Sequence, residues 1–351
     1  MKLLVSGGAG FIGSCFVRQS LAREGESITV LDSLTYAGNL ENLESVVSDA
    51  RSRFVRGSIC DPAAVEEAAY DCDAIVNFAA ETHVDRSIDD PAVFLSTNIE
   101  GPRVLMDHAR KRGIRYLQVS TDEVYGSLGP EGLFTETSPL DPSSPYAASK
   151  TSADLLVSAY ARTYGLDAVI TRCGNNYGLY QFPEKLIPLF VTNALDDREL
   201  PLYGDGLHVR DWIHVEDHCD AIRVVLERGQ SGEVYNISAG GERNNREVCQ
   251  QILAILGKPE SLVRHVTDRP GHDRRYALDS EKLRSALGWA PRIEFEEGLR
   301  STIDWYQSNR PWWERVKSGA YRDYYDRMYG RRLGSQSAEP GLEPERGGSD
   351  E

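Results

Sequence analysis

The 351-residue sequence lacks long apolar runs, paired cysteines and an excess of positive charge. One of its longest apolar stretches, residues 186–195, falls well short of the ~18 residues that span a bilayer. The six cysteines are scattered and form no Cys-x-x-Cys motif. This argues against a disulfide framework or a zinc knuckle and favours a cytoplasmic protein with reduced thiols. The net charge of −15 works against a nucleic acid or an anionic membrane as the main partner.

We also expect no signal peptide, because residues 1–6 run straight into a glycine loop. What the first half does contain is an alternation of short apolar segments with longer amphipathic ones. This alternation predicts an α/β fold with a doubly wound parallel sheet, in which helices cover both faces. The expected strands are 3–6, 28–31, 53–56, 74–78, 116–120 and 168–172, with helices such as 13–23 and 91–112 between them.

The rhythm changes near residue 173 to proline-punctuated segments with short strands and isolated helices. We therefore predict a first domain over 1–172 and a smaller α/β substrate-binding domain over 173–330. A segment near 211–238 is expected to return to the first domain, its strand 234–238 rejoining the first sheet. Residues 331–351 contain no aromatic residue and are rich in Gly, Pro, Ser and Glu, which predicts a disordered acidic tail.

A glycine-rich loop follows the first expected strand and precedes a helix. It can be aligned as Gly7, Gly10 and Gly13, or as Gly8, Gly10 and Gly13. Glycines at this point let backbone N–H groups approach a pyrophosphate at the helix N-terminus, as in Rossmann-type dinucleotide sites. Asp32 ends the second strand, where its carboxylate can accept hydrogen bonds from ribose hydroxyls and would repel a 2′-phosphate. The pattern predicts NAD rather than NADP as the cofactor.

A second constellation lies around Tyr146 and Lys150, four residues apart on one face of a helix that begins near Ser144. A tyrosine acts as a base near neutrality only if its pKa is lowered, which a nearby ammonium and a positively charged nicotinamide would do. Alone, this pair is equally consistent with a solvated lysine beside a half-buried tyrosine. Its position downstream of a dinucleotide motif favours catalysis.

Two adjacent carboxyls follow the strand 116–120, in the sequence Thr121-Asp122-Glu123. Ligands of parallel sheets bind at the carboxyl ends of the strands. Like charges this close raise one pKa, giving a protonated acid beside an ionised base. The alternative interpretation is a solvated acidic turn.

Six further segments carry a resemblance to a known family. They are DSLTYAGN at 32–39, AAETHVDRS at 79–87, STDEVYG at 120–126, NNYG at 175–178, PEKLIP at 183–188 and RPGHDRRY at 269–276. With them the chain resembles the extended short-chain dehydrogenase/reductase family from Lys2 to about Tyr306, and within it the nucleotide-sugar 4,6-dehydratases that act on dTDP-glucose.

The resemblance implies oxidation of the sugar at carbon 4 by bound NAD, loss of water across carbons 5 and 6, and return of hydride to carbon 6. It assigns the 4-hydroxyl proton to Tyr146, assisted by Thr121 and Lys150. Glu123 would remove the proton on carbon 5, and a protonated Asp122 would donate to the departing 6-hydroxyl. It also implies a homodimer through helices 91–112 and 147–163.

The resemblance further implies two sets of binding positions. The cofactor set is Gly7, Gly10, Phe11, Ile12, Gly13, Asp32, Ser33, Leu34, Thr35, Ser58, Ile59, Phe78, Ala79, Ala80, Thr97, Tyr146, Lys150 and Asn176. The substrate set is Thr82, Thr121, Glu123, Asn175, Lys185, Leu186, Pro201, Tyr203, Arg210, Asn245, Arg269 and His272. We expect no metal site, because no histidine spacing indicates one; His214 and His218 are interpreted as structural.

The chain departs from the family pattern at three positions. Ser58 replaces an aspartate that usually contacts the adenine, Leu179 replaces a proline, and Gly174 replaces a serine or cysteine. Three alternatives also remain open. A nucleotide-sugar 4-epimerase would share the glycine loop, Tyr146 and Lys150 but would not need Asp122 and Glu123. GDP-mannose and CDP-glucose dehydratases share the chemistry with another base, and an NAD-binding regulator would keep the fold without turnover.

Overall fold

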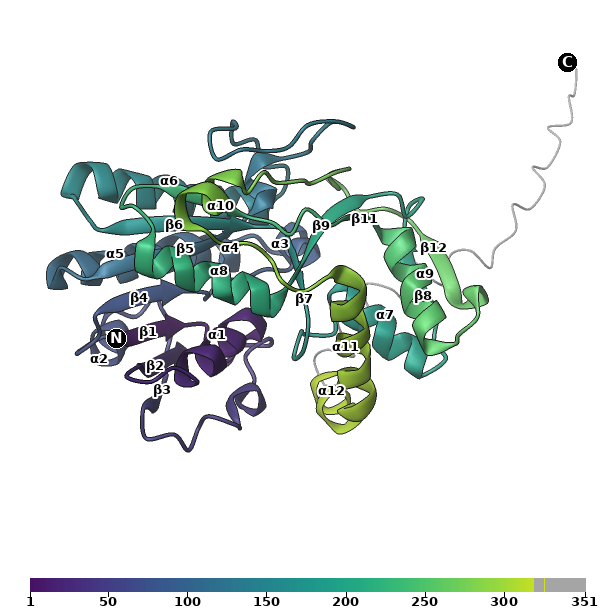
Figure 1. Cartoon of the computed structure of the whole chain (residues 1–351), viewed down its shortest axis with the longest axis horizontal. Coiled ribbons are helices and arrows are strands. Elements are labelled where there is room, and N and C mark those ends of the chain that lie inside the picture. The colour runs from purple at the N-terminus through teal and green to yellow at the C-terminus, as the bar shows by residue number, and fades with distance from the viewer. Residues whose placement is uncertain (319–324, 326–351) are drawn as a thin grey trace, which may run out of the picture.

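The computed structural model describes residues 1–318 and Tyr325, and the predicted tail at 331–351 lies outside the described residues. Its centre is a seven-stranded sheet with the order β10-β6-β5-β4-β1-β2-β3, in which all neighbours are parallel (Figure 1). The strands are β1 (Lys2–Ser6), β2 (Ser27–Asp32), β3 (Ser52–Arg56), β4 (Ala74–Asn77), β5 (Arg115–Thr121), β6 (Ala168–Cys173) and β10 (Val234–Ile237). The expected α/β fold class is confirmed.

Helices cover both faces of this sheet, which is why the three central residues of β1, Leu3–Val5, are all apolar and buried. Leu3 and Val5 of β1 join one core cluster, and Leu4, which points to the other face, joins another. The first cluster includes side chains of α1 (Phe11–Leu21), α8 (Val215–Arg228) and α10 (Glu281–Leu287). The second includes those of α2 (Pro62–Ala68), α5 (Gly101–Arg112) and α6 (Pro145–Tyr164).

The helix expected over 91–112 contains an irregular turn. It consists of α4 (Ala92–Leu95), a π-helical turn over Ser96–Glu100 and α5. Asn98 in the π turn is buried, exchanges hydrogen bonds with the backbone of Glu81, and donates to Ser149 Oγ on α6. The turn thereby fixes the segment after β4 against the helix that carries Tyr146. Such single π turns often occur at functional sites.

The remaining elements form a second body with its own core, seen beside the large sheet in Figure 1. A three-stranded sheet contains β7 (Asn175–Tyr177), β9 (Val209–His214) and β11 (Glu242–Asn244), and β8 (Leu200–Tyr203) pairs with β12 (Val263–Val266). The helices are α7 (Leu186–Leu195), α9 (Asn245–Leu256), α11 (Phe295–Ser308) and α12 (Arg310–Val316).

The segment expected to return to the first sheet is divided between the two bodies. Its first strand, β9, pairs with β7 and β11, whereas α8 packs on α1 and β10 lies beside β6. The chain therefore crosses between the bodies several times, and the carboxyl ends of β1, β4, β5 and β6 face the second body.

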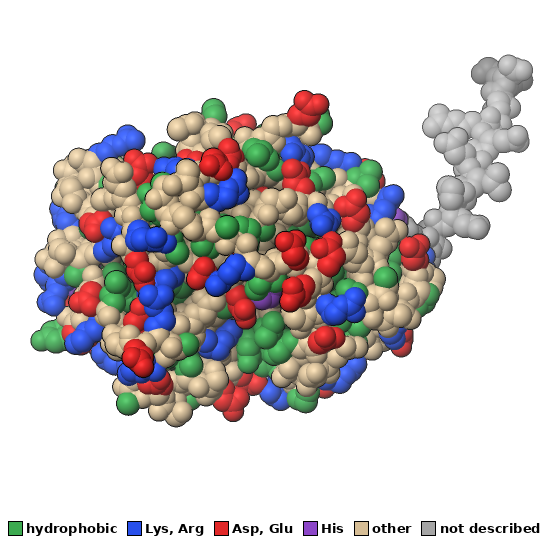
Figure 2. All heavy atoms as spheres, in the orientation of Figure 1, with side chains coloured by type: hydrophobic (Ala, Val, Ile, Leu, Met, Phe, Trp, Pro, Cys, Tyr) green, Lys and Arg blue, Asp and Glu red, His purple; other side chains and the backbone are tan. Residues whose placement is uncertain are grey.

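Over the described residues, no helix has both the length and the apolar character to cross a membrane. Acidic and basic side chains are intermixed on the face that Figure 2 shows, rather than gathered into one patch.

Candidate active site

The glycine loop between β1 and α1 has no room for side chains. Gly7 has a φ of +73°, and a Cβ there would lie 2.6 Å from the backbone nitrogen of Ala79. A Cβ on Gly13 would overlap the carbonyl oxygen of Gly7. Gly10, the N-cap residue that precedes α1, provides no side-chain cap for the first N–H groups of the helix. These unpaired donors suit a pyrophosphate, because a helix N-terminus carries partial positive charge.

Asp32 ends β2 at the side of this loop. Its Oδ1 accepts from the Leu34 backbone at 2.8 Å and its Oδ2 from the Ala9 backbone at 3.0 Å. Burial raises the pKa of the carboxyl, and the two backbone hydrogen bonds oppose this shift. The carboxylate is therefore held in one orientation beside the loop, as an acceptor for ribose hydroxyls requires.

A cavity of about 520 Å³ runs from the glycine loop past Asp32 to Tyr146 and Lys150. Its size suits a cofactor-sized ligand. Every residue of the predicted cofactor set lies on its wall except Leu34. The main chain of Leu34 has a φ of +54° and donates to Asp32, so this residue orients the carboxylate instead of lining the cavity.

Tyr146 and Lys150 lie on the first turns of α6, whose N-terminus forms as the sequence predicts. Ser144 Oγ accepts from the Ala147 backbone at 3.1 Å, and Pro145 occupies the first turn. Lys150 Nζ donates to the Val119 carbonyl at 2.8 Å, which fixes the ammonium beneath the end of β5. Burial raises the pKa of Tyr146 well above its usual value and Glu123 adds to this, whereas a hydrogen bond with Thr121 lowers it. A positive charge is thus needed beside the phenol before it can act as a base.

The Thr121-Asp122-Glu123 segment turns sharply where β5 ends. Thr121 Oγ1 accepts from the Glu123 backbone at 3.2 Å and donates to Asp122 Oδ1 at 3.1 Å. Burial, followed by the nearby Glu123, raises the pKa of Asp122 well above its usual value. Burial also raises the pKa of Glu123, while Arg269 and Lys185 oppose this shift. The environments thus favour a protonated Asp122 and an ionised Glu123.

The two carboxyls differ in access to the cavities. Glu123 lies on the cavity wall, but Asp122 does not, and Asp122 is only 2% exposed. Asp122 Oδ2 has no hydrogen-bond partner among the described residues. Asp122 therefore reaches the cavity through its neighbour Thr121, and its proton donation to a ligand stays a prediction.

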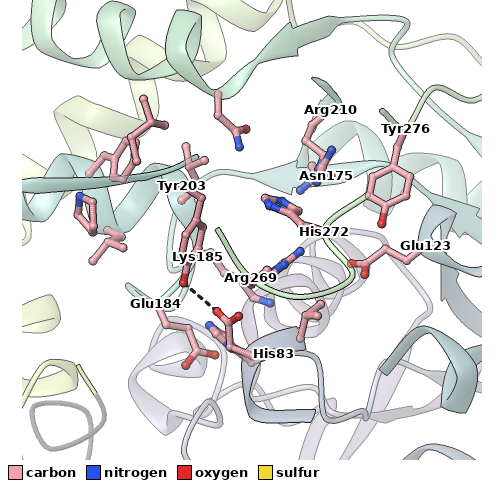
Figure 3. Close-up of a pocket in the computed structure, with 18 of the residues that line it drawn as sticks. His83, Glu123, Asn175, Glu184, Lys185, Tyr203, Arg210, Arg269, His272 and Tyr276 are labelled. Atoms are coloured by element: carbon pink, nitrogen blue, oxygen red, sulfur yellow. Dashed lines mark hydrogen bonds between the residues drawn. The ribbon is translucent and has the colours of Figure 1, made fainter. Parts of the chain in front are cut away.

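A second cavity, of about 150 Å³, continues from Glu123 toward the second body (Figure 3). All twelve residues of the predicted substrate set lie on one wall or the other. Thr82 and Thr121 line the larger cavity, Glu123, Asn175, Lys185 and Leu186 line both, and the second is lined by Pro201, Tyr203, Arg210, Asn245, Arg269 and His272. The second cavity is also lined by residues that the predicted set omits, among them His83, Glu184 and Tyr276. His83, Glu184 and Tyr276 each lie inside one of the six family segments named above, and this was the sequence signal that could have identified them.

Three cations, of which Arg210 is buried and Lys185 and Arg269 are half-buried, face this cavity without a carboxylate partner. Lys185 Nζ donates to the Thr82 carbonyl at 2.9 Å, and Arg210 donates to the Asp273 carbonyl at 3.0 Å. Arg269 Nε has no hydrogen-bond partner within the described part of the chain. None of the three makes an ion pair with any described residue. Unpaired buried cations are costly, and an anionic ligand such as a diphosphate would remove that cost.

Side chains close the cleft between the two bodies. Arg86 of α3 (Val84–Asp89) donates to Glu184 Oε2 at 3.1 and 3.2 Å, and its guanidinium lies 4.1 Å from the centre of the Tyr36 ring. Tyr203 donates to Asp85 at 3.2 Å. These contacts join the loops after β2 and β4 to the second body beside both cavities.

The three departures from the family pattern have different settings. Ser58 lies on the wall of the larger cavity, where its Oγ accepts from the Cys60 backbone at 3.1 Å. A Cβ on Gly174 would lie 2.5 Å from the Asp211 carbonyl oxygen, so a larger residue would require the backbone to shift. Leu179 is half-buried and lies outside both walls.

Comparisons with known proteins find relatives that match most of the chain. The family model described as GDP-mannose 4,6 dehydratase matches residues 4–302. A dTDP-glucose 4,6-dehydratase of Streptomyces niveus is 53% identical over 324 residues, which cover 91% of this chain and 96% of that protein. The crystal structure of DesIV, a dTDP-glucose 4,6-dehydratase from Streptomyces venezuelae with NAD and TYD bound, is 55% identical with a TM-score of 0.89, covering 90% of this chain and all of that one.

A more distant solved structure is the UDP-glucose 4-epimerase of Thermus thermophilus in complex with NAD. It is 34% identical with a TM-score of 0.81, and the match covers 88% of this chain and 100% of that chain. The family model spans most of the sequence, and relatives about half identical cover nine-tenths of it. The chain therefore belongs to the GDP-mannose 4,6 dehydratase family.

Proposed function

We propose that this protein is an NAD-dependent hydro-lyase that converts dTDP-glucose into dTDP-4-keto-6-deoxyglucose and water. The observation that carries the proposal is the acid–base pair of a buried Asp122 and a half-buried Glu123, which lie beside Tyr146 in a cleft that fits a dinucleotide. Relatives 53% and 55% identical to this chain are named dTDP-glucose 4,6-dehydratase. An epimerase needs no such pair, since it removes no proton from carbon 5.

NAD is the expected cofactor, and the structure fits it. The N–H groups at the start of α1 would hold the pyrophosphate, Asp32 the adenosine ribose, and Lys150 the ribose next to the nicotinamide. When bound, NAD supplies the redox chemistry, taking an electron pair from carbon 4 of the sugar and later returning it to carbon 6.

Proton transfer would begin at Tyr146. With the positive charges of Lys150 and the nicotinamide nearby, its Oη takes the proton of the 4-hydroxyl, while Thr121 Oγ1 holds the same hydroxyl. The resulting 4-ketone makes the hydrogen on carbon 5 acidic. Glu123, which lies on the wall of both cavities, would remove it and later return a proton to carbon 5.

Departure of the 6-hydroxyl as water requires one further proton, which Asp122 would supply. One turnover leaves a proton on Tyr146 and removes one from Asp122, so these two groups must exchange a proton to reset. Thr121 hydrogen-bonds both of them, to Asp122 Oδ1 at 3.1 Å and to the Tyr146 side chain. Its hydroxyl is therefore the proposed route between them, which also gives the recessed Asp122 access to the cavity.

The second cavity would hold the nucleotide diphosphate. Arg210, Arg269 and Lys185 supply positive charge, and Asn175, Asn245 and Tyr203 supply neutral hydrogen-bonding groups. Leu186 and Pro201 supply apolar wall.

Three further expectations remain proposals. A homodimer would pair α5 and α6 with their copies; Leu155 and Tyr164 of α6 are 57% and 52% exposed, as an uncovered apolar face would be. A cytoplasmic location is supported by the six cysteines, all of which are free. The division into domains at 172/173, with α8 and β10 returning to the first, is supported by the separate core clusters.

The test is to offer glucose linked to dTDP, UDP, CDP or GDP, and also GDP-mannose, and to look for a 4-keto-6-deoxy product. We expect product with the dTDP sugar, with a deuterium on carbon 4 recovered on carbon 6. Epimerisation without loss of water would favour a 4-epimerase. More product from a sugar linked to another nucleotide would show that this other nucleotide sugar is the substrate. Binding of a nucleotide sugar without any product would favour a regulator.

A further inference from the structure

A histidine that lines neither cavity packs directly behind the proposed diphosphate site. His208, in the loop between β8 and β9, is 4% exposed, and its ring stacks on that of His272 with centroids 3.7 Å apart and planes 11° from parallel. His272 itself lies on the wall of the second cavity, as Figure 3 shows. His208 is thus placed to act on a ligand only through His272.

One carboxylate holds both rings. His272 Nδ1 lies 2.6 Å from Asp268 Oδ1, and His208 Nε2 lies 3.2 Å from Asp268 Oδ2. With Nδ1 of His272 engaged in this way, its Nε2 is the nitrogen left to meet a ligand in the cavity. Within the described residues no hydrogen bond engages Nε2 of His272, and His208 Nδ1 is buried without a partner.

The charges around the pair limit it to one added proton. Two stacked imidazoles cannot both be charged at this separation without strong repulsion. Arg269, Arg210 and the second ring oppose protonation of His272, and Asp268 favours it; around His208 the other charged groups are Asp205 and Arg274. Tyr203 packs edge-on against the His272 ring. Burial and these neighbours lower the pKa of His272 to about 3, so the ring is neutral without a ligand.

The same charges exclude a competing interpretation. Two imidazoles and a carboxylate are typical ligands of a transition-metal ion. Arg210 and Arg269 face the same cavity, however, and their positive charges would repel a metal dication bound beside them. An anion reverses this situation, because it is attracted by both guanidinium groups and favours an added proton on the ring.

We propose that His208, Asp268 and His272 form a proton-accepting unit, in which His208 is a positioning residue and His272 binds the diphosphate as an imidazolium after taking one proton from solvent. This inference rests on the proposed function, since it assumes a nucleotide diphosphate in the second cavity. Substrate affinity then depends on pH through a group remote from the reacting carbons, so KM changes with pH while kcat does not follow it.

The test uses the NAD-loaded enzyme and the phenyl ester of dTDP, which has no sugar to react and whose diphosphate has no titrating proton near neutrality. Calorimetry at pH 6, 7 and 8 in two buffers of different ionisation enthalpy gives the number of protons taken up. We expect up to about one proton per ligand, and a Kd that rises by up to about tenfold per pH unit over the same range. Binding with no proton uptake would overturn the inference and leave the proposed function intact. Failure to bind the ester, together with failure to turn over dTDP-glucose, would instead overturn the proposed function.

Two variants test His208 itself. His208→Phe keeps the stacked ring but removes the hydrogen bond to Asp268, which leaves the carboxylate free to stabilise a charged His272. The midpoint of the dependence of Kd on pH should move to higher pH by about half a unit. This corresponds to a change of about threefold in Kd at a fixed pH, and kcat should not change. His208→Gln, which can still donate to Asp268, should restore the wild-type midpoint. Identical profiles for wild type and His208→Phe would contradict the positioning role.

Discussion

The two cavities of the cleft are built in different ways. The glycine-loop end of the larger one is formed by backbone and small side chains from the β1–α1–β2 unit, such as Gly7, Gly13 and Asp32. The wall of the smaller one consists of long polar side chains from segments far apart in the chain, such as Glu123, Arg210 and Arg269. A local motif therefore suffices for the glycine-loop end of the larger cavity, whereas the smaller cavity exists only once the two bodies have packed together.

The largest expected effect is that of replacing Glu123, which lines both cavities. Glu123→Gln keeps the shape of the carboxyl but cannot accept the proton of carbon 5, so kcat for dehydration should fall by roughly 10²–10⁴-fold. NAD content should remain at the wild-type level, because Asp32 and the glycine loop are untouched. Product formation and exchange of the hydrogen on carbon 5 with solvent are the measurements. Glu131→Gln, at an exposed position in the following loop, is the matched control. Normal dehydration by Glu123→Gln would remove the base from the mechanism.

The second prediction concerns the smaller cavity alone. Arg269→Gln removes a half-buried guanidinium that has no carboxylate partner among the described residues, so KM for the nucleotide sugar should rise by about 10- to 100-fold, as expected for a lost charged hydrogen bond. NAD content should not change. Arg300→Gln, at an exposed position of α11, controls for the loss of one positive charge. If Arg269→Gln lost NAD as well, the two cavities would not be separable binding sites.

The third prediction concerns the larger cavity alone. Gly13→Ala places a Cβ against the Gly7 carbonyl oxygen, so the loop must shift and the N–H groups of α1 lose their alignment. An overpacked site typically loses 1–3 kcal/mol, so NAD should bind about tenfold more weakly or worse. The dinucleotide released on denaturing the purified protein measures this directly. Gly129→Ala, where a Cβ would meet nothing within 4 Å, should retain the cofactor. Equal retention by both variants would show that close packing of the loop is not what holds NAD.

The same contrast between the two cavities explains which parts of the fold and of the site could be predicted from the sequence. The parallel sheet, the glycine loop and the capped start of α6 depend on neighbouring residues, and their patterns predicted them correctly. The residues of the smaller cavity could be named only through the resemblance to a family, since no local pattern places Arg210 near Arg269. Side-chain placement escaped both routes. Leu34 orients Asp32 through its backbone, and Asp122 is recessed behind Thr121, because each depends on the local course of the chain after a strand.

The recessed position of Asp122 leads to the smallest predicted effect, one on stability. The pKa of Asp122 is raised in the folded protein. As pH rises above the ordinary pKa of an aspartate, this residue therefore loses its proton in the unfolded chain before it does so in the folded protein. The folded state then binds more protons than the unfolded state, and stability falls with rising pH over that interval. Asp122→Asn keeps an acceptor for Thr121 but has no proton to lose. Its Tm at pH 7 should therefore exceed that of the wild type by about 2–4 °C, the shift that 1 kcal/mol gives in a sizeable domain. At pH 3 the two Tm values should converge, because the aspartate of the unfolded wild type is then largely protonated too. A variant that is less stable than wild type at pH 7 would show that Asp122 is ionised in the folded protein and is not the proton donor to the 6-hydroxyl.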